Sequence, residues 1–255
     1  MMRRYGVISD IHGNLHAFLA VLQKLTELEV DDIICLGDIV GYGPRPGQCL
    51  DLVANYCGVV VRGNHDDAAL DLRLANQMNS HASEAIHWTR KRLGPLHFDA
   101  MNRMPVSRHI GDRVMCIHDC PIQAPTDYIH DQYMAAASFR GVTTQICLVG
   151  HTHVPMIFEA DSTDADDRLT ATDITAYIGS DGVDIPLFGD RRYICNPGSV
   201  GQPRDADPRA SFAVLDLDRN TFTVHREEYD IEAAQADTEA VGLPTILGER
   251  LAIGA

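Results

Sequence analysis

Five short polar blocks, each placed where a short apolar run ends, constrain this sequence more than any other feature. Four blocks directly follow the runs GVIS, DIICL, GVVV and QICLV, and the fifth ends the run RVMCI. Such runs predict strands, so each block lies where a strand gives way to a loop, which is where an open α/β sheet carries its functional groups. Seven side chains in these blocks can bind a metal ion: Asp10, His12, Asp38, Asn64, His118, His151 and His153.

The chemistry of these seven side chains indicates a site for divalent metal ions. Carboxylates, an amide oxygen and neutral imidazoles, without a thiolate, suit Mn, Fe, Zn, Co or Ni better than a soft metal or a structural zinc. Positions i and i+2 of an extended chain point the same way, so Asp10 and His12 can meet one ion, and His151 and His153 repeat that spacing. Two ions about 3.5–4 Å apart can hold a bridging hydroxide for a displacement at phosphorus. A carboxylate shared between the two ions is then expected.

Taken in order, the blocks resemble the calcineurin-like metallophosphoesterase superfamily, whose pattern runs D-x-H, G-D, G-N-H-[DE], H and G-H-x-H. Further segments look like its compact prokaryotic phosphodiesterase-like or phosphatase-like branch: GYGPRP after Asp38, NPGSVGQPRD at 196–205, and the ending YD…GLP…ERL. The resemblance implies an α/β (α+β) fold, with a two-sheet β-sandwich of mixed strands flanked by helices. It also implies that residues 1–255 form one domain.

The resemblance implies a role for each block. His65 would be the acid that faces the leaving group, pointing away from the ions because it follows Asn64 directly on an extended backbone. Asp66 would lie behind His65 and hold its imidazole in the productive tautomer. Two divalent ions are implied, with Mn favoured. The first would take Asp10, His12, Asp38 and His153, and the second Asp38, Asn64, His118 and His151.

Three residues near these blocks are candidate substrate contacts. Arg204 follows the NPGSVG turn and can bind a phosphate oxygen through its forked guanidinium, although the segment can equally be a tight connection only. Arg62 resembles the arginine of the protein-phosphatase version R-G-N-H. That branch has a second arginine in a D-R-G block, which Gly41, Tyr42 and Gly43 replace here. This departure weakens the case for a phosphoprotein substrate and leaves Tyr42 as the third candidate.

The fourth block departs from the family pattern after its histidine, where glycine is common. Asp119 and Cys120 stand there instead. Asp119 can orient an imidazole, but a solvated loop carboxylate is the default interpretation. The seven cysteines are odd in number and scattered, so they predict buried thiols rather than a disulfide framework. Cys116 and Cys120 flank His118 without a second cysteine pair nearby, which argues against a zinc site there.

The order of the predicted elements favours one α/β domain. The first half alternates strand and helix, which predicts a parallel sheet. Residues 66–104 read as helical, the second half reads as antiparallel, and residues 159–184 read as a solvated loop or an irregular hairpin. The predicted strands are 5–9, 32–36, 59–62, 106–110, 113–118, 145–149, 191–195, 210–217 and 221–229, and the other predicted helices are 15–28, 46–56 and 131–139.

Composition excludes several classes of protein. A net charge of −15 over 255 residues argues against a duplex nucleic-acid binder, which needs a basic surface. The apolar runs are too short to span a bilayer, and the start of the chain shows no secretory apolar region. We therefore expect a cytoplasmic protein without a membrane partner, whose oligomeric state the sequence leaves open.

The favoured function is hydrolysis of phosphate esters, by a phosphodiesterase or a broad phosphatase that uses a hydroxide held between two metal ions. The alternative is a serine/threonine protein phosphatase or a dinucleoside polyphosphate hydrolase. A non-catalytic metal-binding module would be expected to lack Asp38 or His65, and both are present. A nucleotide-binding switch needs a glycine-rich phosphate loop after the first strand, and DIHGN has one glycine.

Overall fold

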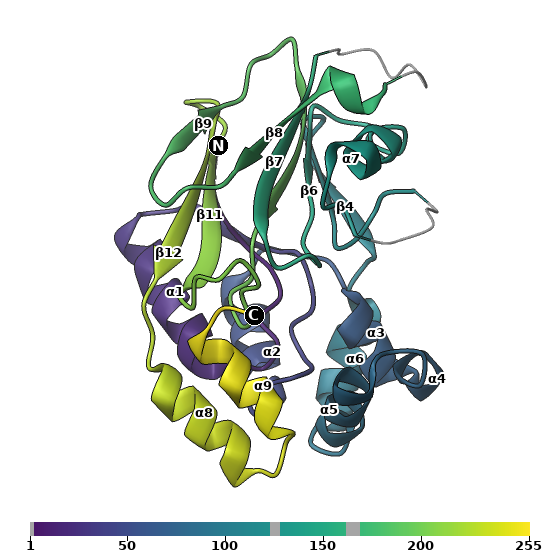
Figure 1. The fold of residues 1–255 in the computed structure, drawn as a ribbon, viewed down its shortest axis with the longest axis vertical. Coiled ribbons are helices and arrows are strands. Elements are labelled where there is room, and N and C mark those ends of the chain that lie inside the picture. The colour runs from purple at the N-terminus through teal and green to yellow at the C-terminus, as the bar shows by residue number, and fades with distance from the viewer. Residues whose placement is uncertain (1–2, 123–127, 162–168) are drawn as a thin grey trace.

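The computed structural model describes residues 3–122, 128–161 and 169–255. Two mixed sheets of six strands pack face to face, and helices cover the outside (Figure 1). In spatial order, the first sheet contains β3 (Val59–Val60), β2 (Asp32–Cys35), β1 (Arg4–Ile8), β11 (Ala210–Asp216), β12 (Thr221–Glu227) and β9 (Asp184–Pro186). The second sheet contains β4 (Ser107–Ile110), β5 (Val114–Ile117), β6 (Ile146–Leu148), β10 (Arg192–Pro197), β7 (Pro155–Ala160) and β8 (Ile174–Ile178).

Helices surround the sandwich in three groups (Figure 1). The first group packs on and below the first sheet and contains α1 (Leu15–Glu27), α2 (Pro46–Tyr56), α8 (Ile231–Ala240) and α9 (Thr245–Glu249). The second group follows β3 and contains α3 (Asn64–Leu70), α4 (Leu72–Ala75), α5 (Ser80–Arg90) and α6 (Pro95–Arg103). On the second sheet lies α7 (Gln132–Ser138), near the short 3₁₀ helix η1 (Ala171–Asp173), and a second such turn, η2 (Arg250–Ala252), follows α9. Within the described residues, none of these helices has the length and apolarity to cross a membrane.

Strand alternation sorts the apolar side chains between two cores. In β1, Val7 faces the second sheet while Ile8 faces α1, and in β2 Ile34 and Cys35 divide in the same way. Because successive side chains of a strand point to opposite faces, a sheet that is covered on both sides reads as a continuous apolar run. This is why DIICL and GVIS show no polar alternation, and why their polar residues come only where the strand ends.

The predicted elements are present, with ends that differ by one or two residues. β1, β2 and β3 form the expected parallel sheet, and β11 and β12 form the expected antiparallel hairpin. Within residues 159–184, β8 pairs with β7 as a regular hairpin, while 162–168 lie outside the described residues. The expectation of an antiparallel second half was wrong for three strands. β5, β6 and β10 run parallel. The helix α7 is the crossover between β5 and β6, and the chain reaches β10 only after β7, β8 and β9.

Glycine is required at Gly13, which follows the first polar block. Its φ is +61°, and a Cβ there would lie 2.7 Å from the Gly43 carbonyl oxygen. Gly111 has a similar φ of +54° with nothing within 4 Å, so it is a matched control. We expect Gly111→Ala to lower the free energy of unfolding by about 1–2 kcal/mol through backbone strain, and Gly13→Ala by roughly 1–3 kcal/mol more through overpacking. Urea unfolding of both variants measures this difference, and equal losses would contradict it.

Candidate metal centre

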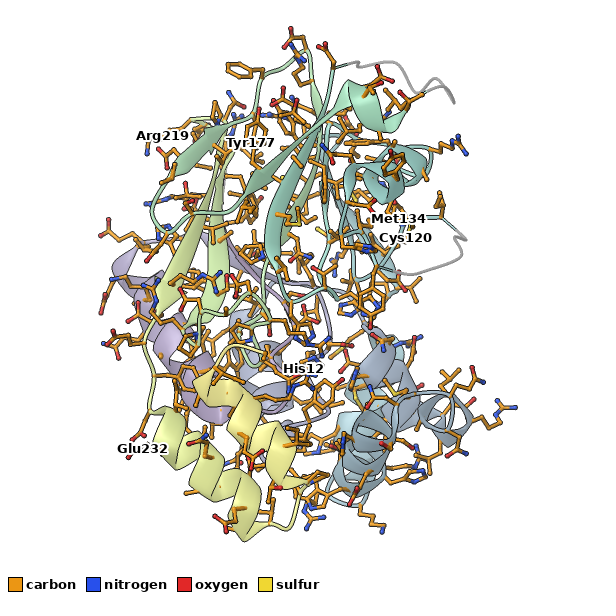
Figure 2. The ribbon with its side chains drawn as sticks, in the orientation of Figure 1. His12, Cys120, Met134, Tyr177, Arg219 and Glu232 are labelled. Atoms are coloured by element: carbon orange, nitrogen blue, oxygen red, sulfur yellow. The ribbon has the colours of Figure 1, made fainter. Side chains whose placement is uncertain are left out.

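The polar blocks from both sheets meet at one end of the sandwich. Asp10 and Asp38 follow β1 and β2 of the first sheet, while His118 and His151 follow β5 and β6 of the second. Figure 2 shows His12 between the sheets and the helices below them. The side chains fall into three overlapping groups whose potential ligand atoms lie within 4.8 Å of one another: Asp10, His12 and His153; His12, Asp38 and His65; and Asp38, His118 and His151.

Three imidazoles are oriented by the protein backbone. The Nδ1 atoms of His12, His118 and His153 lie 3.1, 2.8 and 2.6 Å from the carbonyl oxygens of Val40, Leu36 and Gln202. Because a carbonyl only accepts, each Nδ1 carries the proton and each Nε2 is directed toward the centre, as in histidines that bind metal. The Nε2 atoms of His12 and His153 are 3.1 Å apart. Two lone pairs at that distance repel each other unless a cation or a proton lies between them.

Each carboxylate uses one oxygen for the backbone and turns the other toward the imidazoles. Asp10 Oδ2 accepts from the His151 backbone N–H, and Asp38 Oδ1 accepts from the His65 backbone N–H. Asp10 Oδ1 lies 3.3 Å from His153 Nε2 and 3.9 Å from His118 Nε2. Asp38 Oδ2 lies 3.3 Å from His118 Nε2 and 3.7 Å from His12 Nε2. Asp38 therefore stands between imidazoles that come from different sheets, whereas Asp10, which follows β1, faces two imidazoles of the second sheet.

Several buried polar atoms at this centre have no hydrogen-bond partner among the described residues. They are Asp10 Oδ1, Asn64 Oδ1, His65 Nδ1 and His118 Nε2. Buried polar groups are normally satisfied, so a cluster of unsatisfied atoms needs an explanation. Oxygen and nitrogen donors about 3–4 Å apart match the spacing of ligands around a divalent ion, whose bonds to them are about 2.0–2.2 Å long. The residues present therefore fit a divalent metal ion.

The backbone at the centre is held in an uncommon conformation. Five of the seven candidate ligands have positive φ: Asp10, His12, Asp38, His151 and His153, between 48° and 67°. Residues other than glycine rarely adopt this region, and strain of this kind clusters at functional sites at a cost of roughly 1–3 kcal/mol per residue. Each strand thus ends in a sharp turn that brings the side chain into the centre. This geometry replaces the extended i, i+2 arrangement that the sequence analysis expected for both D-x-H and H-x-H.

In the metal-free centre, the neighbouring carboxylates favour a proton on His118. Burial by itself lowers the pKa of His118, but the Asp38 and Asp10 carboxylates beside it raise that pKa to about 10. Burial and the charge of His118 lower the pKa of His151 to about 3, so that ring is neutral, as a metal ligand must be. A divalent ion would displace the His118 proton, so metal binding and protonation compete at this site.

His65 lies beside the candidate ligands, and its ring contacts those of His12 and Tyr42. Its ring centroid is 4.7 Å from that of His12 and 4.6 Å from that of Tyr42. A Cβ at Gly41 would come within 2.3 Å of His65 Nδ1, so the loop can cover this ring only with glycine there. Burial lowers the pKa of His65 to about 4, which makes the imidazole neutral at pH 7 in the metal-free chain.

Two expectations about this block need correction. Asn64 and His65 open α3 rather than continue an extended strand, so helical geometry separates their side chains. The Asp66 carboxylate does not hold the His65 ring. Its oxygens accept from the backbone N–H groups of Ile39, Val40 and Gly63, and thereby join the β2 loop to the start of α3. Burial and the charge of Asp38 raise the pKa of Asp66 to about 7.

Of the three candidate substrate contacts, two lie together beside the centre. The Arg204 guanidinium donates to Tyr42 Oη at 3.4 Å and to Gln202 Oε1 at 3.1 Å, while its Nε is buried without a partner among the described residues. The Tyr42 ring is buried against His12. Arg62 instead pairs with Asp67 and donates to the carbonyl oxygens of Met101 and Met104, so its guanidinium is directed toward α6.

Of the two residues after His118, Cys120 is the buried thiol that the sequence analysis expected, while the role of Asp119 stays a prediction. Cys120 is buried, with its Sγ 3.1 Å from Ser138 Oγ of α7, which identifies it as a packing thiol. Asp119 is half-buried and is not in any of the three ligand groups. In the described residues, all seven cysteines are free thiols.

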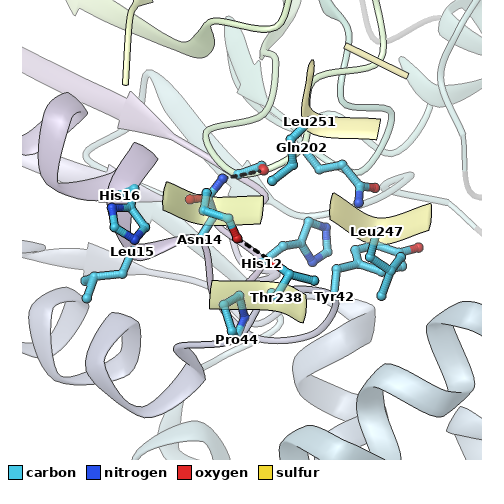
Figure 3. Close-up of a pocket in the computed structure, with 13 residues that line it drawn as sticks. His12, Asn14, Leu15, His16, Tyr42, Pro44, Gln202, Thr238, Leu247 and Leu251 are labelled. Carbon is cyan, nitrogen blue, oxygen red and sulfur yellow. Dashed lines mark hydrogen bonds between the residues drawn. The ribbon is translucent and has the colours of Figure 1, made fainter. Parts of the chain in front are cut away.

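The NPGSVG segment is hydrogen-bonded to Asp10 of the first polar block. The turn residues of this segment alone did not predict this structural role. Ser199 Oγ donates to the Asp10 carbonyl, and the Gly201 N–H donates to the same oxygen. Asn14, which caps α1, donates to the Gly201 carbonyl at 3.0 Å. Behind His12, Figure 3 shows side chains of α8 and α9 closing a cavity of about 10 Å³, which has room for little more than one water molecule. The space behind His12 is therefore too small for a phosphate ester.

Tyr128 is the residue that the sequence analysis missed. Its ring stacks on that of His151 with centroids 4.1 Å apart, and it is 41% exposed. No motif surrounds Tyr128, and it follows His118 by ten positions in a segment without strand or helix pattern. Only the folded chain shows that it covers a candidate ligand.

Comparison with known proteins agrees with this geometry. A family model for the calcineurin-like phosphoesterase superfamily domain matches residues 3–220. The chain belongs to the calcineurin-like phosphoesterase superfamily. The crystal structure of a metallophosphoesterase from Sphaerobacter thermophilus superimposes with a TM-score of 0.86 at 38% identity, covering 100% of each chain.

Two curated proteins are also similar to this chain. An uncharacterized protein of Methanocaldococcus jannaschii is 33% identical over 253 residues, covering 98% of this chain and 97% of that protein. Serine/threonine-protein phosphatase 1 of Salmonella typhimurium is 34% identical over 79 residues, which is 29% of this chain and 35% of that protein. The first similarity extends over the whole fold, and the second is local.

Metal binding can be tested by thermal unfolding, without an activity assay. A ligand at 100 times its dissociation constant stabilises the folded chain by about 2.7 kcal/mol, which for a protein of this size raises the Tm by roughly 5–10 °C. We expect Mn²⁺ to produce this shift in the wild-type chain and in His81→Ala, an exposed histidine of α5. His153→Ala should lose most of the shift. An unchanged shift in His153→Ala would show that the stabilising ion lies elsewhere.

Proposed function

We propose that this chain hydrolyses phosphate esters with the help of two divalent metal ions. The observation that carries the proposal is the pair of Nε2 atoms of His12 and His153, which face each other at 3.1 Å while both rings use Nδ1 as a donor to a carbonyl. The unsatisfied oxygens of Asp10 and Asn64 complete a set of donors that a cation would satisfy. Membership of the phosphoesterase superfamily supports the choice of substrate.

The donors divide into two sets that share Asp38. When bound, the two ions supply Lewis acidity, which lowers the pKa of water and neutralises charge on the phosphate. Asp38 would contribute to both sets, because its Oδ2 lies between His12 and His118. We propose Mn as the favoured metal among Mn, Fe, Zn, Co and Ni, as the resemblance implies; the oxygen donors are suited to Mn, and the imidazoles also suit Fe, Zn and Ni. The first set would be Asp10, His12, Asp38 and His153, and the second Asp38, Asn64, His118 and His151.

Two further side chains beside these donors would take part in the reaction, His65 as an acid and Arg204 as a cation. His65 would donate a proton to the departing oxygen, since a bound phosphate next to it favours the protonated ring. Arg204 would bind a non-reacting phosphate oxygen through its unsatisfied Nε. Tyr42 would keep both groups in position, because its ring packs on His65 and its hydroxyl accepts from Arg204. The orientation of Arg62 toward α6 gives it a supporting role in this scheme.

Phosphodiesterase or broad phosphatase activity is our first choice of reaction. A serine/threonine protein phosphatase is the second candidate, and the local similarity to the Salmonella enzyme supports it. Gly41, Tyr42 and Gly43 stand where that branch has its D-R-G arginine, which speaks against it. We see dinucleoside polyphosphates as a further alternative substrate. The net charge of −15 argues against binding of duplex nucleic acid. We also propose a cytoplasmic location.

Metal analysis of Asp38→Asn tests the dinuclear proposal. We expect about two ions per wild-type chain and a loss of both in Asp38→Asn, since the shared oxygen disappears while the amide can still accept from the His65 N–H. Asp99→Asn, an exposed residue of α6 that pairs with Arg103, is the control and should keep both ions. Ester hydrolysis should fall together with metal content. A single bound ion that persists in Asp38→Asn would refute the two-metal arrangement.

A leaving-group series tests the role of His65. General acid catalysis contributes typically about 10²–10⁴ in rate, and it matters most for a poor leaving group. We expect His65→Asn to retain its metal and much of its activity on an activated aryl ester, and to lose far more on an alkyl or nucleoside ester. His109→Asn, an exposed histidine of β4, should change neither. Equal losses across the series would rule out proton donation, and loss of metal would identify His65 as a ligand.

A further inference from the structure

A second depression lies beside the metal centre, on the side of His151. Its volume is about 400 Å³, and Tyr128, His130, Thr152, Val154 and Met156 line it. Most of this surface is contributed by an aromatic ring, a thioether and an aliphatic side chain. None of the five residues carries a carboxylate, a lysine or an arginine, so the depression does not suit a strongly charged group.

This depression is continuous with the candidate ligands. Tyr128 forms its wall and stacks on the ring of His151 at 4.1 Å. Thr152 separates the two ligands His151 and His153, and Val154 follows them directly. The Arg204 N–H donates to the His153 carbonyl, so the candidate phosphate contact lies on the same loop system. A group attached to a phosphate at the centre would thus reach this depression past Tyr128, whose hydroxyl lies beside the Arg204 side chain.

We propose that this depression is a subsite for a planar aromatic group of the ester substrate, a proposal that rests on the hydrolase function above. The half-exposed face of Tyr128 offers an aromatic ring the offset stacking that such rings prefer. Met156 offers a polarizable sulfur that packs well against ring edges. A volume of about 400 Å³ falls in the range of small-molecule sites, at roughly 300–1,000 Å³. The subsite therefore selects esters that carry an aryl group or a nucleobase.

Binding of two phosphonates to the metal-loaded protein tests the subsite without turnover. Phenylphosphonate and methylphosphonate carry the same anionic head and differ only in the group that would enter the depression. We expect phenylphosphonate to bind at least about tenfold more tightly, the discrimination that an apolar pocket typically achieves for one additional group. Isothermal titration calorimetry gives both dissociation constants. The dissociation constants of adenosine 5′-monophosphate and ribose 5-phosphate are then compared in the same way. Tighter binding of adenosine 5′-monophosphate would show that the depression accepts a nucleobase as well as a small aryl group.

Matched variants test whether the residues of the depression cause the higher affinity for phenylphosphonate. Met156→Gln keeps the length of the side chain but makes it polar, and Val154→Thr keeps its shape. Both should reduce the preference for phenylphosphonate several-fold, while methylphosphonate affinity and metal content stay unchanged. Leu96→Gln, at an 83% exposed position on α6, makes the same kind of change far from the depression and should preserve the preference.

Two outcomes would overturn the subsite, and they are distinguishable from failure of the proposed function. Equal affinity of the wild-type chain for the two phosphonates, with ester hydrolysis intact, would refute the subsite alone. A preference that survives in both Met156→Gln and Val154→Thr would place the aromatic group elsewhere. If neither phosphonate binds and no ester is hydrolysed, the proposed function fails, and the subsite fails with it.

Discussion

Hydrogen bonds from imidazole Nδ1 to backbone carbonyls determine what this centre can bind. They set the tautomer of His12, His118 and His153, and they direct three Nε2 atoms into one small volume. The accepting carbonyls belong to two distant segments of the chain, since Leu36 and Val40 lie in the loop after β2 and Gln202 follows β10. The donor set therefore exists only when both of these segments have reached their final positions, which makes the site a property of the whole fold rather than of a local motif.

Strained turns at the strand ends bring the donor side chains to the centre. A strand that ended in relaxed geometry would direct every second side chain toward the sheet faces, where the cores lie. Positive φ at Asp10 and Asp38 turns the backbone instead, so that carboxylates reach a buried centre from strands packed in apolar surroundings. The segment 196–201 stabilises the first turn by donating to the carbonyl of Asp10. Asp66 stabilises the loop after β2 by accepting from the backbone N–H groups of Ile39 and Val40. Strain at the centre is thus offset by hydrogen bonds from outside it.

The sequence predicted the fold class and the neighbourhood of the centre because both depend on local patterns. Apolar runs define strands, and polar residues at their ends fall at a common edge when the strands are parallel. What the sequence could not predict depends on long-range packing. Four features join residues whose sequence patterns carry no information about one another. They are the parallel pairing of β6 with both β5 and β10, the hydrogen-bond partners of Asp66, the orientation of Arg62, and the stacking of Tyr128 on His151.

The donors come from both sheets, since His12 and His153 are 141 positions apart in the chain. An ion held between them would connect the two layers of the sandwich, in addition to the apolar contacts of their shared core and the hydrogen bonds from His151 and Ser199 to Asp10. In this respect it would act as a removable cross-link that is present only in the folded chain and stabilises it by binding there. Separation of the sheets would then require release of the ion first, so the lifetime of the folded state, and with it resistance to proteolysis, would follow the metal supply of the surroundings.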